Sequence, residues 1–203
     1  MTEVLAYSGA ILTLLALVPY IIDVIRKKTK PNIVSWFTWT LLTSIATAAA
    51  FQAGEPEAAL LTLANAIGTF AIVILGLRNG IAKFSLFDAL CQIGALIALA
   101  LWLILDSPAI AIVGVVFIDF LGVLPTVRHS WISPEEETWQ TFFLSTIAPC
   151  FTIASLQAYN IENLLYPTYL LLADGAVMCV ILYRRKALGI NMTKTGDHET
   201  LHE

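Results

Sequence analysis

Hydrophobic positions gather into seven blocks along this chain, and each block is about as long as a membrane-spanning helix. A helix of roughly 20 apolar residues crosses about 30 Å of hydrocarbon. Because hydrocarbon supplies no hydrogen-bond partners, the backbone of such a block must pair with itself, which it does as a helix. The pattern predicts an all-α membrane protein with seven transmembrane helices. The blocks cover Val4–Ile25, Ile33–Ala53, Ala58–Leu77, Leu86–Leu105, Ala109–Val127, Thr138–Ala158 and Leu164–Tyr183.

Composition agrees with this pattern and excludes several classes of function. The chain has 203 residues, of which 58% are hydrophobic and 13% charged, whereas a soluble domain carries about 25% charged residues. We therefore expect the lipid bilayer as a partner, and the net charge of −4 argues against nucleic acid. Cys91, Cys150 and Cys179 fall singly inside hydrophobic blocks and predict neither a disulfide framework nor a metal site. No catalytic motif accompanies them, so the sequence predicts neither an enzyme nor a cofactor.

The basic residues predict how the helices are oriented. All 11 Lys and Arg residues fall on one side of the seven predicted helices, and the positive-inside rule makes that side cytoplasmic. An odd number of crossings then places the N-terminus outside and the C-terminus in the cytoplasm. We expect an integral protein of a plasma (inner) membrane. The opposite side carries only acids, at Glu3, Glu55, Glu57, Asp106 and Glu162.

Three short matches relate the beginning of the chain to its end. Residues 31–36 and 134–139 both read proline, three residues, a hydroxyl residue and tryptophan. Pro19 and Pro125 occupy matching places near the ends of their helices. In the third helix of each unit, Asn65 corresponds to Asp174. Because the three matches occur in the same order, they indicate an internal repeat.

The repeat divides the chain into a first three-helix repeat (1–80), a linker transmembrane helix (81–106), a second three-helix repeat (107–189) and a polar tail (190–203) that is expected to be disordered. Three crossings is an odd number, so the linker helix is needed to give both repeats the same orientation. Such parallel repeats are a transporter layout, in which the substrate site lies near the bilayer midplane between the repeats.

This layout resembles that of the PQ-loop and SWEET transporters. The 3+1+3 helices, the outside N-terminus, the proline in the first helix of each repeat and the polar residue in the third carry the resemblance, which covers roughly residues 4–186. The name-giving Pro-Gln pair is Pro19-Tyr20 and Pro125-Thr126 here. SWEET sugar transporters offer an Asn from both third helices, so Asn65 matches and Asp174 departs. The resemblance implies a small-solute transporter, and the departure argues against a plain uniporter for neutral sugars.

Asn65 and Asp174 are the first candidates for substrate contact. The Asn65 amide offers two donors and two acceptors. An ionised Asp174 in hydrocarbon costs about 2.5–3.5 kcal/mol unless it faces water or a partner, so we expect it to contact substrate, carry a proton, or both. Asp119, within the fifth helix, is a second candidate for proton coupling. The structural alternative for these residues is hydrogen bonding between helices.

Aromatic and proline residues are the remaining candidates. Trp39, with Phe142 as its repeat equivalent, is expected to form a cavity wall. Trp36 and Trp139 suit either substrate stacking or an aromatic belt at the membrane interface. Pro19 and Pro125 remove backbone hydrogen bonds and suit hinges for a cytoplasmic gate, or simple helix ends.

Other polar and small residues have simpler interpretations. Asp23 is expected at the interface, solvated or paired with a nearby basic residue. The acids at 135–137 are expected to open the sixth helix, where they suit the helix dipole. Gly68 with Gly76, and Gly94 with Ala98, allow close helix packing within a protomer or in a homo-oligomer.

These features predict an alternating-access transporter of a small polar solute, sugar-like in the first instance, with proton coupling through Asp174 or a positively charged substrate as the reason for that acid. The alternative is a membrane receptor or scaffold that uses the same bundle to bind a ligand without transporting it. Flux in liposomes separates the two.

Overall fold

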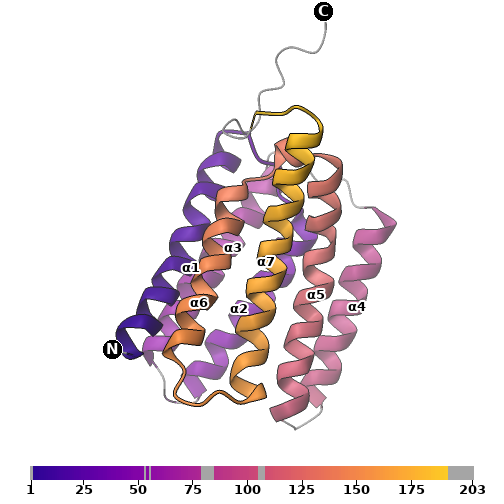
Figure 1. Cartoon of the computed structure of the whole chain (residues 1–203). Helices are drawn as coiled ribbons and strands as arrows, with labels where there is room; N and C mark the ends of the chain where they lie inside the picture. The colour runs from indigo at the N-terminus through magenta and orange to yellow at the C-terminus, as the bar shows by residue number, and fades with distance from the viewer. Residues whose placement is uncertain (1, 53, 55, 79–84, 105–107, 192–203) are drawn as a thin grey trace, which may run out of the picture.

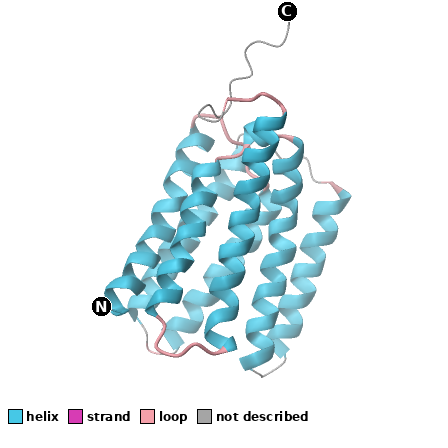
Figure 2. Cartoon of the chain, in the orientation of Figure 1, coloured by secondary structure: helices cyan, strands magenta, loops and turns pink. Residues whose placement is uncertain are grey.

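The computed structural model describes residues 2–52, 54, 56–78, 85–104 and 108–191. Within these residues the chain forms seven α-helices and one turn of 3-10 helix, and no strand (Figures 1 and 2). The predicted tail lies outside the described residues from 192 onward. The elements are α1 (Thr2–Ile25), α2 (Ile33–Gln52), α3 (Pro56–Arg78), α4 (Leu86–Ile104), α5 (Pro108–Ile132), η1 (Pro134–Glu136), α6 (Trp139–Ser155) and α7 (Ile161–Ala187).

Each hydrophobic block corresponds to one helix, and the all-helical class is confirmed. The ends differ most in the second half of the chain. Helix α5 continues past the predicted Val127 to Ile132, and α7 covers Ile161–Ala187 rather than Leu164–Tyr183. Hydrophobicity marks only the apolar part of a helix, whereas backbone hydrogen bonding continues through polar residues that face water.

Within the described residues, five helices, α1, α2, α3, α5 and α7, are long and apolar enough to cross a membrane, and α4 contributes a shorter apolar stretch over Leu86–Ala100. Their outer surfaces carry large apolar side chains, such as Leu60, which is 65% exposed, and Leu172, which is 63% exposed. A soluble monomer rarely exposes contiguous apolar surface of this kind. These features are those of an all-α membrane protein.

Six helices form a closed ring, and α4 packs outside it (Figure 1). Around the ring the order is α1, α3, α2, α5, α7 and α6, and α6 returns to contact α1. Helix α4 lies against α5 and touches α2. The ring therefore encloses an interior to which six helices contribute.

Glycines allow several close approaches within this single chain. A side chain on Gly68 would meet Leu17, and one on Gly94 would meet Leu121. Gly76 faces Pro31 and Ile33 in the same way. These small residues thus serve packing inside the protomer.

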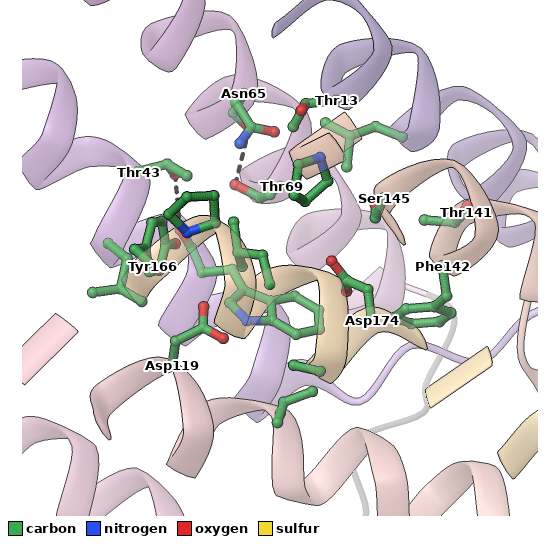
Figure 3. A pocket seen from close by; sticks show the side chains of 18 of the residues that line it. Thr13, Thr43, Asn65, Thr69, Asp119, Thr141, Phe142, Ser145, Tyr166 and Asp174 are labelled. Carbon is green, nitrogen blue, oxygen red and sulfur yellow. Dashed lines mark hydrogen bonds between the residues drawn. The ribbon is translucent and has the colours of Figure 1, made fainter. Parts of the chain in front are cut away.

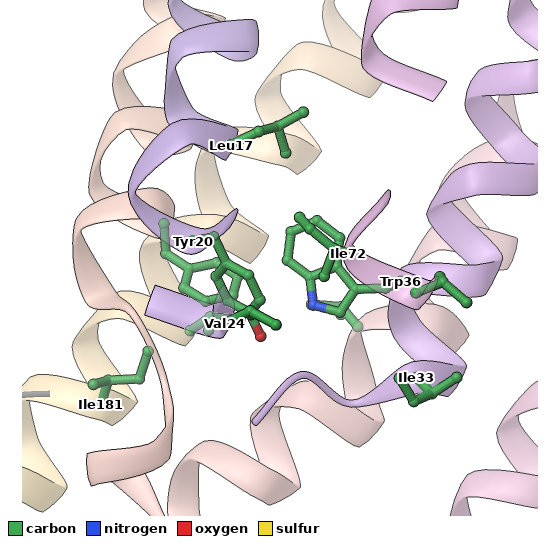
Figure 4. Packing of buried hydrophobic residues seen from close by; sticks show 11 residues of the cluster. Leu17, Tyr20, Val24, Ile33, Trp36, Ile72 and Ile181 are labelled. Carbon is green, nitrogen blue, oxygen red and sulfur yellow. The ribbon is translucent and has the colours of Figure 1, made fainter. Parts of the chain in front are cut away.

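One end of the bundle, here called the basic end, is where α1, α3, α5 and α7 finish and α2 and α6 begin. Contacts between distant segments hold these termini together, including an ion pair between Lys30 and Glu136. The main hydrophobic cluster fills the ring on this side (Figure 4). It draws on all six ring helices, through Leu17, Tyr20, Val24, Ile33, Trp36, Ile72, Val73, Val123, Phe142, Val177 and Ile181.

We predict that Gly9→Val destabilises the protein by about 1–3 kcal/mol, the usual cost of overpacking. At Gly9, helix α1 approaches α6 so closely that an added Cβ would lie 3.1 Å from the Ala148 carbonyl oxygen and 3.2 Å from the Phe151 Cβ. Ala6→Val, at an exposed position of the same helix, is the control. Thermal melting followed by tryptophan fluorescence in detergent measures both, and equal melting temperatures would contradict the packing described.

Candidate functional site

A cavity of about 300 Å³ lies inside the ring. All six ring helices contribute side chains to it, whereas none of the described lining residues comes from α4. Most of the candidates from the sequence meet here: Asn65, Asp174, Asp119, Trp36, Trp39 and Phe142 all line the cavity. Trp139 is not among the lining residues, and its ring packs against Phe143, 6.2 Å away between centroids.

Asn65 and Asp174 reach the cavity from opposite walls. Asn65 lies on α3 and Asp174 on α7, and these helices are three places apart in the ring of six. Figure 3 shows both side chains, together with Asp119, turned toward the same space. A solute held between the two walls would therefore contact both halves of the chain.

Asp119 is held in place by an aromatic partner that the sequence did not indicate. Its Oδ2 accepts a hydrogen bond of 2.7 Å from the Tyr169 hydroxyl of α7, and its carboxyl also interacts with the Trp39 side chain. The Asp119 side chain is only 4% exposed. No pattern in the sequence pairs residues 50 positions apart, so only the packing of α5 on α7 reveals this contact.

Hydroxyl side chains make the cavity rich in acceptors. Thr13, Thr43 and Thr69 each donate their proton to the backbone carbonyl four residues earlier, at Gly9, Trp39 and Asn65; two of these threonines are drawn with their bonds in Figure 3. A hydroxyl that has used its donor still has lone pairs to offer. These threonines therefore present oxygen acceptors alongside two carboxyl groups.

One polar hydrogen near the cavity lacks a partner in the described part of the chain. The Thr141 Oγ1 is buried without a hydrogen bond, and Thr141 lines the cavity. An unsatisfied buried group is costly, by about 1–3 kcal/mol. A bound solute or water at this end of the cavity would satisfy it.

The floor of the cavity lies toward the basic end. Leu17, Trp36, Val123 and Phe142 belong both to the cavity lining and to the main hydrophobic cluster. The Tyr20 ring, just beneath them, lies 4.5 Å from the Trp36 ring and 6.4 Å from the Phe142 ring between centroids. This aromatic layer separates the cavity from the basic end.

The prolines proposed as hinges flank that floor. Pro19 lies inside α1 and Pro125 inside α5, each two residues beyond a floor residue, Leu17 and Val123 respectively. Two further prolines, Pro149 in α6 and Pro167 in α7, line the cavity itself. Each proline removes one backbone hydrogen bond from its helix, so the helices around the cavity bend more readily than uninterrupted ones.

Beneath the floor, the acids at 135–137 do not open the sixth helix as expected. Pro134–Glu136 forms η1, α6 begins at Trp139, and its first turn holds no acid. Instead the Glu137 side chain is fully buried and its Oε2 accepts a hydrogen bond of 3.0 Å from the Tyr20 hydroxyl. The expectation was wrong because a run of acids in the sequence shows only where charge lies along the chain. It does not show whether the fold buries one of these side chains.

Asp23, near the end of α1, has a threonine as its partner. Its carboxylate accepts a hydrogen bond of 3.0 Å from the Thr138 hydroxyl, which also shares a hydrogen bond with Thr29. Both threonines are fully buried. Asp23 thus joins the end of α1 to the start of α6.

The described residues contain no metal-binding group. No group of three or more His, Cys, Asp and Glu side chains among them lies close enough to hold a metal ion. Cys91, Cys150 and Cys179 are free thiols.

Comparison with known proteins adds no family to this description. No family model, curated protein or solved structure matches the chain.

We predict that Glu137 makes the stability of the protein depend on pH. Burial raises the pKa of this carboxyl from 4.5 to about 8, partly offset by the hydrogen bond from Tyr20. Between these values the folded state holds a proton that the unfolded chain has lost, so stability falls as pH rises from about 4.5 and levels off above about pH 8. The fall is on the order of a few kcal/mol.

The comparison with Glu137→Gln isolates this contribution. Glutamine does not titrate, so the difference in melting temperature between parent and variant is expected to shrink or reverse as pH rises across that window, and then to stay constant. A difference that is the same at all pH values would show that Glu137 ionises in the folded protein as it does in the unfolded chain.

Proposed function

We propose that this protein is an alternating-access transporter of a small polar solute rich in hydrogen-bond donors, such as a monosaccharide or another polyol. The observation that carries the proposal is the cavity itself, enclosed by six helices, with Asn65 and Asp174 on opposite walls and an aromatic floor toward the basic end. A cavity between two halves of a bundle is the arrangement that alternating access requires.

The packing of the helices supports a parallel repeat. A half-turn of the ring order exchanges α1 with α5, α3 with α7 and α2 with α6, which are the pairs that the repeat in the sequence predicts. In each set of three, the third helix lies between the first and the second. With α4 as the linker outside the ring, the packing supports the proposed 3+1+3 layout of seven crossings, which resembles that of SWEET transporters.

The distribution of charge supports the proposed orientation. Basic residues of the described chain, including Arg26, Lys30 and Arg185, lie at the basic end, which we assign to the cytoplasm of a cell with this protein in its plasma (inner) membrane. The N-terminus is then outside and the C-terminus inside. In this state the cavity is closed toward the cytoplasm by the aromatic floor.

The lining favours one class of solute. Its acceptors include the threonine oxygens and the carboxyl groups of Asp119 and Asp174, and none of its described lining residues is Lys, Arg or His. An anion would meet repulsion without compensation, whereas hydroxyl or ammonium groups would find acceptors. The volume lies at the lower end of small-molecule pockets, which suits a solute of monosaccharide size.

The prolines and the floor supply a route for opening. Bending of α1 at Pro19 and of α5 at Pro125 would draw apart the floor residues that precede them, Leu17 and Val123. The solute would then leave toward the basic end while the other end closes. Only small rotations at helix interiors are required, as in other hinge motions.

We predict that Asn65→Ala and Asp174→Asn each reduce solute flux at least tenfold in proteoliposomes, because each removes a contact from one wall of the site. Uptake of radiolabelled monosaccharides and polyols measures this, with the lipid-exposed Thr168→Ala of α7 as the control that should retain flux. Binding of a solute by the parent without any flux would favour the receptor or scaffold instead.

We further predict that Asp174→Asn loses solute accumulation driven by a pH gradient while it retains some exchange of labelled for unlabelled solute. Exchange needs only a binding site, whereas accumulation needs a group that gains and loses a proton in each cycle. Asp119→Asn tests the second candidate in the same assay. If Asp174→Asn accumulates solute with the pH dependence of the parent, Asp174 is not the coupling residue.

A further inference from the structure

Glu137 lies where segments from both halves of the chain meet, at the basic end. Its carboxyl Oε2 accepts the hydrogen bond from Tyr20, and Tyr20 belongs to α1 in the first half. The Glu137 side chain itself belongs to the connection between η1 and α6 in the second half. The contact is completely buried, so the two halves cannot separate here without breaking it.

The main chain around Glu137 is fixed from a third direction. The Arg185 guanidinium of α7 donates from Nη2 to the Glu137 carbonyl at 2.7 Å and from Nε to the Pro134 carbonyl at 3.0 Å. Arg185 is itself fully buried. These bonds anchor the main chain from Pro134 to Glu137 to α7, so a movement of α1 relative to α7 moves Tyr20 away from the Glu137 carboxyl.

The other oxygen of the carboxyl faces a histidine. His129 of α5 places its Nε2 3.9 Å from the Glu137 Oε1 and 3.6 Å from the Glu136 Oε2. Neither the Glu137 Oε1 nor the His129 Nε2 has a hydrogen-bond partner among the described residues. The His129 side chain is 22% exposed, so it offers the buried carboxyl a connection to water.

The charged and titratable groups that surround Glu137 come from every element packed on it. They are Tyr20 and Asp23 of α1, Lys30 of the following loop, His129 of α5, Glu135 and Glu136 of η1, and Arg185 of α7.

These groups do not give the Glu137 carboxyl full compensation for its charge. Arg185 lowers its pKa and Glu136 raises it, but burial is the largest effect and leaves the pKa at about 8. A carboxylate buried without adequate pairing is unfavourable. The closed arrangement therefore favours the protonated acid at neutral pH.

We propose that Glu137 is a proton-binding site that latches the basic end closed through Tyr20, separate from the acids of the cavity. Loss of the proton leaves a buried carboxylate whose charge Tyr20 and Arg185 compensate only in part. Hydration of that charge, from the side where His129 is part-exposed, requires this end of the bundle to open. This inference rests on the proposed function, because opening of that end is a step of alternating access.

The latch reaches the cavity through one side chain. The Tyr20 ring contacts Trp36 and Phe142, which form the cavity floor, while its hydroxyl bonds Glu137. Release of the hydroxyl frees the ring to move out of the floor. Protonation at the basic end is thereby connected to access to the solute site.

Distances between spin labels at Arg26 and Ile132 test the proposal. Both side chains are exposed, at the basic ends of α1 and α5, and the native cysteines Cys91, Cys150 and Cys179 are first replaced by alanine. Electron paramagnetic resonance on the protein in nanodiscs compares about pH 6.5 with about pH 9.5. We expect the ratio of long to short distances in the parent to rise about tenfold or more, with its midpoint near the pKa of the latch.

Variants separate the latch from other causes. Glu137→Gln mimics the protonated acid and is expected to keep the short distance at both pH values. Tyr20→Phe keeps the ring but removes the hydroxyl, so it is expected to populate the long distance even at about pH 6.5. Thr168→Ala, at an exposed position of α7, is the control and should open like the parent.

Two results would overturn the proposal: distances in the parent that do not change with pH, or a Glu137→Gln protein that opens with pH as the parent does. The flux assay reports separately on the proposed function. Opening that depends on Glu137 without any flux would refute transport and leave the latch, whereas flux with opening independent of Glu137 would refute the latch alone.

Discussion

Hydrocarbon offers no hydrogen-bond partner, so the polar side chains of a membrane-spanning helix need partners inside the protein. The arrangement of the helices in this chain follows from that constraint. The outer faces of the helices carry residues such as Leu60 and Leu172. Polar side chains turn inward, and the helices close into a ring around them. A ring of six, unlike a tightly packed four-helix bundle, leaves an interior with room for a solute. The polar residues of the cavity thus follow from the same constraint that arranges the helices.

The same constraint explains why the cavity offers acceptors. A threonine in an apolar helix satisfies its proton most readily on its own backbone, four residues earlier, as Thr13, Thr43 and Thr69 do. The remaining lone pairs then face the interior. Asp119, bound by Tyr169, adds a carboxyl held in one orientation. A solute that brings several donors complements these acceptors, and none of the described lining residues is Lys, Arg or His.

The helices of the two halves of the ring pack in the same order, but corresponding positions carry different polar side chains. Asn65 on one wall faces Asp174 on the other. At the basic end, Tyr20 has a buried acid as its partner, whereas its counterpart Thr126 is buried with a hydroxyl that makes no hydrogen bond within the described residues. These differences distinguish the two halves although their helices pack in the same order. Glu137, whose pKa burial raises to about 8, is one such difference at the basic end.

The sequence by itself determined the helices and their inward residues, because the lengths of apolar blocks and the cost of burying charge are local properties. It identified Asn65, Asp174, Asp119 and Trp39 as polar or aromatic residues that need a partner inside the bundle, and all four line one cavity. Tertiary structure alone decided which groups meet. The contact between Tyr169 and Asp119 and that between Tyr20 and Glu137 join residues 50 and 117 positions apart, and no periodicity encodes such pairs. The acids at 135–137 show the limit most clearly, since a run of charge predicts exposure, and only the fold, by placing Arg185 and Tyr20 around Glu137, could bury one of them.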